Sequence, residues 1–254
     1  MSFNTTDFGY KQVPINEKTK LVASLFTSVA DKYDLMNDVM SMGMHRIIKH
    51  RAVRLSGVKA GDYVLDLAGG TGDLAVYFSK IVGIKGRVIL ADINEAMLKR
   101  GKKRVSEKIG TYRNVIYITT DAELLPFYSN SFDCVAISFG MRNFTDKMKA
   151  LNSVKRVLKP NGKLIILDFS KPEGKILQKA YYIYSFRIVP IVAKLLTGKG
   201  ESYRYLAESI RMHPDQKKLK EMMEEGGFSR CCYCNMMHGI TALHEGTKPG
   251  EKTY

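Results

Sequence analysis

The chain has 254 residues, 45% of them hydrophobic, which is enough to build one large core with a modest appendage. Lysine and arginine outnumber aspartate and glutamate by 40 to 25, and the resulting charge of +15 favours an anionic partner such as a nucleic acid or a membrane face. The polar N-terminus does not resemble a signal peptide, and no run approaches eighteen apolar residues, so no membrane-spanning helix is expected.

A helical segment is predicted before the first strand, over residues 17–55. Apolar residues recur there at helical spacing, first at Leu21, Leu25 and Val29. Because the segment precedes the core, we expect it to lie over the carboxyl ends of the sheet or along one side. A lid over a binding site is the functional interpretation.

Residues 64–73 read V-L-D-L-A-G-G-T-G-D and predict a ligand-binding loop. An apolar strand ends near Asp66, and a second carboxylate, Asp73, stands where a helix should begin. Glycines such as Gly70 let the backbone come close to a ligand. The loop also matches the dinucleotide fingerprint G-x-G-x-x-A, but a pyrophosphate at the helix N-terminus would meet a like charge at Asp73. A ligand carrying an ammonium and a sulfonium suits both carboxylates, and S-adenosylmethionine is such a ligand.

The next two predicted strands also end in acids. Asp92 lies about 20 residues after the last loop glycine, where an acid typically accepts both ribose hydroxyls of an adenosine. Asp121, followed by Ala122, could offer an oxygen to the adenine amino group. Each acid alone could simply cap the next helix or turn. Their order along three strands, after a glycine loop, predicts a nucleoside cofactor.

Strands and helices alternate from residue 63 to residue 169. This alternation predicts an α/β fold with a doubly wound, mostly parallel seven-stranded sheet, Rossmann-like, completed by an antiparallel hairpin at its edge. The K-P-N-G run at 159–162 is expected to end a helix. The expected strands are 63–68, 87–93, 115–120, 131–138, 163–169, 228–236 and 240–243, and the expected helices between them are 73–82, 94–108, 146–158 and 217–225.

The loop after the fourth strand is the candidate substrate site, since reacting groups in such sheets sit beyond the carboxyl ends of central strands. Phe139 to Asn143 supply a flexible glycine, a cation at Arg142 and an amide at Asn143, which together can hold an oxygen-bearing substrate. Both side chains could instead pair with local backbone. The loop lacks the Pro-Pro-aromatic sequence of base-amine methyltransferases and the cysteine nucleophile of cytosine C5 enzymes.

An aromatic-rich stretch, Ile176 to Leu196, follows, and Pro190 must kink or divide it. Core packing is one interpretation, and an apolar substrate tunnel or an interfacial helix is the other. We expect a single domain over 1–254, made of the lid (17–55), a cofactor-binding core (60–170), a helical insert facing substrate or membrane (171–212), and a C-terminal helix with edge strands (213–254).

The clustered cysteines do not predict a metal site. Cys231 and Cys232 would point to opposite faces of a strand, so they cannot both converge with Cys234. Reduced thiols without a signal peptide fit a cytoplasmic protein.

Taken together, these motifs resemble the ubiquinone/menaquinone biosynthesis C-methyltransferases, from about Thr27 to His244. The resemblance implies a class I methyltransferase that uses S-adenosylmethionine to methylate a ring carbon of a polyprenyl benzoquinol or demethylmenaquinol. The family's cofactor contacts fall on Thr71, Asp92, Asp121, Ala122 and Ser138. The matching segments are K-Y-D-L-M-N-D from Lys32, D-L-A-G-G-T-G-D, A-D-I-N, D-A-E-L-L-P-F, F-G-M-R-N, R-V-L-K-P-N-G, D-F-S-K-P and R-Y-L-A-E-S-I-R-M-H-P.

Quinol chemistry then suggests roles for the loop and the lid. Loss of a hydroxyl proton pushes electron density onto the ring carbon, so the enzyme must position both partners and stabilise a phenolate, with no metal required. Arg142 is expected to stabilise the phenolate, Asn143 to orient the ring, and Tyr33 to close over the site. The group that removes the proton stays open between a water held by Arg142 and, as weaker alternatives, His45 and His50.

A polyprenyl quinol is dissolved in the bilayer, so the enzyme is expected to contact the inner face of the cytoplasmic membrane peripherally. No nucleic-acid partner is expected, and assembly as a homo-oligomer or in a biosynthetic complex is left open. Two other functions stay open as alternatives. The fingerprint would suit an NAD-dependent oxidoreductase, and the basic balance would suit an RNA-binding methyltransferase.

Overall fold

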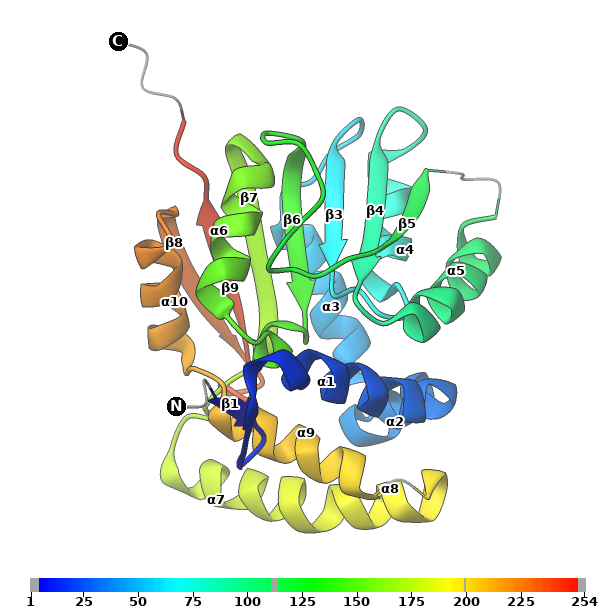
Figure 1. Ribbon diagram of the computed structural model, residues 1–254, viewed down its shortest axis with the longest axis vertical. Helices are drawn as coiled ribbons and strands as arrows, with labels where there is room; N and C mark the ends of the chain where they lie inside the picture. The colour runs from blue at the N-terminus through cyan, green and yellow to red at the C-terminus, as the bar shows by residue number, and fades with distance from the viewer. Residues whose placement is uncertain (1–4, 111–113, 199, 251–254) are drawn as a thin grey trace.

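A computed structural model describes residues 5–110, 114–198 and 200–250, and a seven-stranded sheet forms its centre (Figure 1). The strand order is β5-β4-β3-β6-β7-β9-β8. Neighbours from β5 to β7 pair in parallel, whereas β9 is antiparallel to both β7 and β8. The predicted fold class is therefore confirmed. The strands are β3 (Tyr63–Leu67), β4 (Arg87–Asp92), β5 (Val115–Thr119), β6 (Phe132–Ser138), β7 (Leu158–Phe169), β8 (Ser229–Met236) and β9 (Thr241–Thr247).

Helices cover both faces of the sheet because successive strand side chains point to opposite sides. Val64 packs in one core cluster with α3 (Met44–Leu55), α4 (Asp73–Val82) and α5 (Glu95–Ile109). Its neighbour Leu65 packs in the other, with α6 (Lys147–Val157) and α10 (Gln216–Glu225). Burial of one such leucine stabilises the fold by roughly 1.5 to 3 kcal/mol. These two layers fix the strand ends from which the candidate site is built.

A separate group of helices lies beyond the carboxyl ends of the parallel strands (Figure 1). It has its own small core of Val29, Met36, Val189, Ala193 and Tyr203. The predicted lid lies there, except that its last helix, α3, packs on the sheet face instead. The helices of this group are α1 (Ile15–Val29), α2 (Tyr33–Ser41), α7 (Lys175–Ile183), α8 (Val189–Thr197) and α9 (Gly200–Met212), with a 3-10 turn at Ala30–Lys32 and a π-helical turn at Tyr184–Ile188.

The π-helical turn bears out the expected division of the aromatic stretch. It ends just before Pro190, which stands in the first turn of α8 and has no N–H to continue the ladder of α7. None of the described helices combines the length and the apolar composition needed to cross a membrane.

The element bounds differ from the prediction in three details. The K-P-N-G run ends a helix as predicted, since α6 stops at Val157 with Leu158 as its C-cap. The run itself belongs to β7, which begins at Leu158 rather than at 163, and it bulges there: β6 advances from Phe132 to Cys134 while β7 advances from Leu158 to Lys163. The last strand extends to Thr247, because it pairs with β7 along its whole length. An unpredicted hairpin, β1 (Thr5–Phe8) with β2 (Lys11–Pro14), precedes α1.

Candidate functional site

Two adjoining cavities lie between the sheet and the helices at its carboxyl end. The polar cavity, about 100 Å³, is lined by α1 and by the loops that follow β3, β4, β5 and β6. The apolar cavity, about 390 Å³, is lined by α1, α2, α3 and the helices α7, α8 and α9. Phe26, Tyr33, Lys49 and Phe139 line both and form the wall between them. The arrangement can hold two ligands side by side.

Asp66 supplies a buried carboxylate to the polar cavity from the end of β3. Its Oδ2 accepts a hydrogen bond from the Ala75 N–H at 2.9 Å, in the first turn of α4. Its Oδ1 is buried without a hydrogen-bond partner among the described residues. Burial raises the pKa of Asp66 to about 7. A cationic donor in the cavity would satisfy the unpartnered oxygen, so the site fits the ammonium end of S-adenosylmethionine.

Asp92 stands at the end of β4 and orders the glycine loop. Its Oδ2 accepts from the Gly70 N–H at 2.9 Å and its Oδ1 from the Asn94 N–H at 2.8 Å. Burial raises the pKa of Asp92, and hydrogen bonds from the backbone of Asn94, Gly70 and Ile93 oppose that rise. Each oxygen keeps a lone pair for a ligand hydroxyl. A diol can therefore be accepted without displacing the loop.

The ends of β5 and β6 complete the polar cavity. Asp121 Oδ1 accepts from the Glu123 N–H at 2.9 Å, and the Ser138 Oγ is buried without a hydrogen-bond partner among the described residues. These unused polar atoms are consistent with a polar ligand. The cavity lining includes every residue predicted to bind the cofactor: Asp66, Gly70, Thr71, Asp92, Asp121, Ala122 and Ser138.

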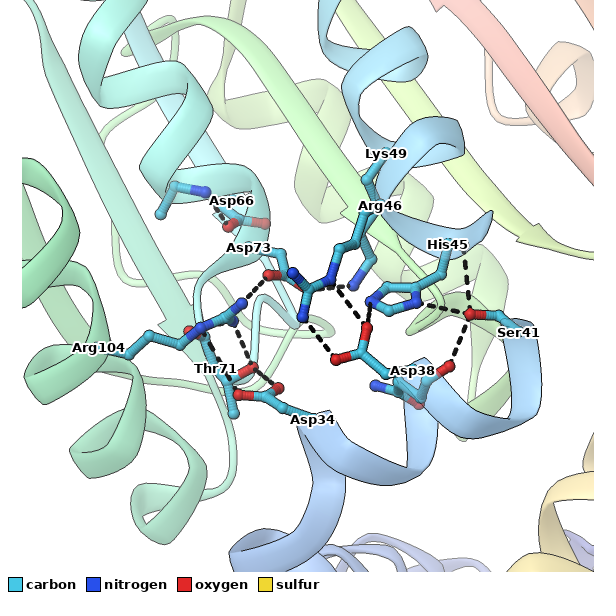
Figure 2. A network of polar contacts seen from close by, with 12 residues as sticks. Asp34, Asp38, Ser41, His45, Arg46, Lys49, Asp66, Thr71, Asp73 and Arg104 are labelled. Carbon is cyan, nitrogen blue, oxygen red and sulfur yellow. Dashed lines mark hydrogen bonds and ion pairs between the residues drawn. The ribbon is translucent and has the colours of Figure 1, made fainter. Parts of the chain in front are cut away.

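The second loop carboxylate, Asp73, does not stand free for a ligand as the sequence suggested (Figure 2). Lys49 of α3 binds its Oδ2 at 2.7 Å, and Arg104 of α5 binds its Oδ1 at 2.5 Å. Burial alone would raise the pKa of Asp73, but the two cations outweigh it and hold the pKa well below its usual range. The same arginine donates to the Thr71 hydroxyl, which in turn donates to Asp34 of the lid at 2.9 Å. This network fastens the lid to the glycine loop.

The predicted substrate residues are divided between the cavities. Tyr33 lines both, Asn143 lines the polar cavity, and Arg142 lines the apolar one. Arg142 is buried and pairs with Asp168 through Nη1 at 3.0 Å, and it also donates to the Phe139 carbonyl. Its Nε–H is buried without a partner among the described residues. Arg142 therefore pairs with neighbouring protein groups and still has one N–H that could donate to a substrate.

Sequence reasoning missed several residues of the site. Lys49 was not predicted because it lies in a helix rich in basic residues, where nothing in the sequence distinguishes a buried lysine from a solvated one. Phe139 adopts a left-handed backbone with φ of 56°, which no pattern predicts. Asn94 caps α5 and also donates to the Ala23 carbonyl of α1 at 2.7 Å. Only its position as a helix N-cap could have been found in advance.

Comparison with known proteins agrees with this geometry. A family model described as the ubiE/COQ5 methyltransferase family matches residues 13–248. A ubiquinone/menaquinone biosynthesis C-methyltransferase UbiE from Pseudomonas putida is 58% identical over 96% of this chain and 95% of its own. The protein of the same name from Teredinibacter turnerae is 56% identical over 96% of this chain and 98% of its own.

Solved structures agree at the level of the fold. A SAM-dependent methyltransferase from Aquifex aeolicus superposes with a TM-score of 0.57 at 22% identity, covering 78% of this chain and 88% of its own. A SAM-dependent methyltransferase from Thermotoga maritima gives a TM-score of 0.63 at 18% identity, covering 89% and 98%.

Replacement of Asp92 should weaken S-adenosylmethionine binding without unfolding the chain. We expect Asp92→Ala to weaken the calorimetric free energy of binding by about 2 to 4 kcal/mol, and so to raise the Kd, because two charge-assisted hydrogen bonds to the ribose would be lost. Glu107→Ala, an exposed acid on α5, is the matched control and should leave the Kd unchanged. An unchanged Kd in Asp92→Ala would exclude Asp92 from the site.

Binding of S-adenosylmethionine should also depend on pH through Asp66. The ammonium pairs with the carboxylate, so below a pKa of about 7 the carboxyl must lose its proton before it can bind. We expect the Kd to increase by up to about tenfold for each pH unit below that value and to become constant above it. Calorimetry in two buffers of different ionisation heat would count the released proton. Asp66→Asn should abolish the dependence, and a dependence that survives in it would disprove the assignment.

Proposed function

The chain belongs to the ubiE/COQ5 methyltransferase family, and we propose that it transfers a methyl group from S-adenosylmethionine to a ring carbon of a polyprenyl quinol in ubiquinone and menaquinone biosynthesis. The observation that carries the proposal is the pair of adjoining cavities, one polar and one apolar, which share a wall. The direct test is to incubate the purified chain with S-adenosylmethionine and a short-chain benzoquinol or demethylmenaquinol. A product heavier by one methylene, methylated on carbon, is expected by mass spectrometry.

The polar cavity is assigned to the cofactor. Asp92 would hold the ribose, Asp121 the adenine, and Asp66 the ammonium of the methionine end. When bound, S-adenosylmethionine supplies an electrophilic methyl group on a sulfonium sulfur. Because two cations already bind Asp73, Asp66 is the acid of this cavity with a buried oxygen that has no partner among the described residues, which favours a ligand of positive charge. The dinucleotide alternative offers no such match, since a pyrophosphate would meet these acids.

The apolar cavity is assigned to the quinol ring and the start of its tail. Leu25, Val29, Tyr181 and Leu206 are among its lining residues, so it disfavours charged ligands and suits a hydrocarbon. Arg142 lies in the same lining with a free Nε–H, which can donate to a phenolate oxygen as negative charge develops there.

Two residues would orient the ring. Asn143 accepts a hydrogen bond from the Tyr205 hydroxyl at 3.2 Å, which fixes its amide. Tyr33 packs edge-on against Phe26 with ring centroids 6.0 Å apart, so its ring is held at the wall between the cavities. Both groups are therefore preorganised before a substrate arrives.

The helical insert is assigned to the membrane surface. Ile188, Ile191 and Leu195 recur at spacings of three and four on one helical face, and all three side chains are exposed. The opposite side of the same helices lines the apolar cavity. Exposed cations, among them Arg187 and Lys194, accompany the apolar face. Apolar area and positive charge are the two signals that reversible peripheral binding combines.

Arg142 should act on turnover rather than on cofactor binding. A lysine cannot hold the Asp168 pair and offer the Nε–H together, so Arg142→Lys is expected to lower kcat by at least about tenfold with the S-adenosylmethionine Kd nearly unchanged. Arg87→Lys, which also removes hydrogen bonds to local carbonyls, is the control at the far end of the sheet. Equal kcat in Arg142→Lys and the parent would leave Arg142 a structural residue.

The exposed apolar face of the π-helical turn and α8 should be needed for the enzyme to reach long-tailed quinols in the membrane. We expect the triple change Ile188→Ser, Ile191→Ser, Leu195→Ser to reduce binding to anionic vesicles and turnover of long-tailed quinols, while a tail-free analogue is methylated normally. Residual binding should fall as salt rises, because charges are screened beyond a Debye length of about 8 Å at physiological salt. Ile84→Ser with Tyr128→Ser, exposed at the opposite end of the sheet, is the control. If both substrate classes are lost together while vesicle binding is unchanged, the membrane assignment fails.

A further inference from the structure

His45 is a titratable group in the apolar cavity to which the roles above give no part. It lies on α3, only 9% exposed, and it is the only one of the five histidines, all in the described ranges, that lines this cavity. His50 on the same helix is exposed, and its ring packs against Tyr77 with centroids 5.4 Å apart. His213 is buried elsewhere, outside the lining.

The hydrogen bonds around His45 fix its tautomer (Figure 2). Its Nδ1 lies 2.7 Å from the Ser41 Oγ, and that hydroxyl donates its one hydrogen to the Asn37 carbonyl at 2.6 Å. Because the hydroxyl proton is already used, the serine accepts from His45, and Nδ1 carries the ring hydrogen. The Nε2 atom is left with a lone pair that can accept a proton.

A carboxylate lies close enough to His45 to stabilise the imidazole in its protonated form. Asp38 Oδ1 lies 3.8 Å from His45 Nε2, and Arg46 holds that carboxylate with two hydrogen bonds at 2.8 and 2.5 Å. Lys49 and Asp73 also act on the imidazole, as does Arg46 itself. Burial, followed by Lys49 and Arg46, lowers the pKa of His45 below its ordinary value of 6.5, against the opposing effect of the two acids. The ring is therefore neutral at neutral pH.

We propose that His45 is the general base that removes the quinol hydroxyl proton before methyl transfer, an inference that rests on the function proposed above. The O–H bond breaks with its electron pair left on oxygen, and the proton forms a bond to Nε2. Asp38 then stabilises the imidazolium, while Arg142 in the same cavity lining stabilises the phenolate. After methylation His45 returns the proton to that oxygen as the ring carbon loses its hydrogen to water, so one proton is released in each turnover.

Other groups of the cavity are less suited to this step. The guanidinium of Arg142 stays protonated in proteins and is a poor base. Lys49 is already engaged by Asp73 at 2.7 Å. The tyrosine hydroxyls that line the cavity at 181, 203 and 205 have pKa values raised to about 12 or above by burial, so they do not become phenolate bases at neutral pH.

The test compares His45→Gln with His50→Gln, assayed on a tail-free quinol. General-base catalysis contributes about 100 to 10,000-fold, so we expect kcat of His45→Gln to fall at least about 100-fold with the S-adenosylmethionine Kd retained, and His50→Gln to keep the parent kcat. With S-adenosylmethionine kept saturating at every pH, so that protonation of Asp66 does not contribute, the parent kcat/KM for the quinol should rise with pH along an acid limb whose midpoint lies below 6.5, since the base must be deprotonated. That limb should be absent in His45→Gln. An unchanged kcat, or a low kcat that keeps the limb, would overturn the proposal.

Two further measurements separate catalysis from a structural role. Imidazole added to His45→Ala should restore turnover, whereas a merely structural histidine would not be replaced in this way. Asp38→Asn should move the acid limb to lower pH, because the imidazolium loses its carboxylate partner. No rescue together with an unmoved limb would overturn the base assignment alone. Absence of any methylated product with the parent protein would overturn the proposed function, and this inference with it.

Discussion

One largely buried carboxylate, Asp73, connects the lid and the glycine loop with two helices that pack on the sheet. Its side chain is 15% exposed, and the cations that bind it, Lys49 and Arg104, are 10% and 19% exposed. A buried ion pair gains little over an apolar substitute, but loss of one partner strands a charge at a cost of about 3 to 5 kcal/mol. Removal of any one of Asp73, Lys49 and Arg104 is therefore expected to destabilise the other two. Because these cations engage both oxygens of Asp73, the buried acid oxygen without a partner among the described residues belongs to Asp66, and that oxygen is suited to a cationic ligand.

The wall between the cavities depends on a strained residue. Phe139 has a φ of 56°, a region that non-glycine residues seldom occupy, and its N–H is held by the Leu167 carbonyl at 2.7 Å. Its ring lies 4.9 Å from that of Phe169, and Lys49 Nζ lies 5.6 Å from the ring centroid. The next residue, Gly140, would clash with Ala68 if it carried a Cβ, at 2.6 Å. The two loops thus pack so closely that the aromatic ring is forced into the boundary, where it keeps a polar chamber apart from an apolar one.

Local rules predicted the fold well and the site in part. Alternating apolar strands and a glycine loop determine where a parallel sheet ends, so Asp66 and Asp92 could be assigned to the polar cavity from their positions alone. The role of Asp73 could not be predicted, because its partner Lys49 comes from a helix 24 residues earlier and nothing local marks that lysine as buried. Pro160 shows the limit of a local rule. The rule correctly ends α6 before this proline, but only tertiary pairing with β6 makes its neighbours part of a bulged strand.

Direct hydrogen bonds join the helical insert to the lid. The Tyr184 hydroxyl, in the π-helical turn, donates to the Met40 carbonyl of α2 at 2.5 Å, and Lys32 donates to the Leu196 carbonyl at the end of α8 at 2.6 Å. A joint displacement of the π-helical turn and α8 would therefore carry these lid residues with it or break both bonds. Because α8 bears the face assigned to the membrane, and Tyr184 lines the apolar cavity, docking on a bilayer and opening of the cavity would act on the same contacts.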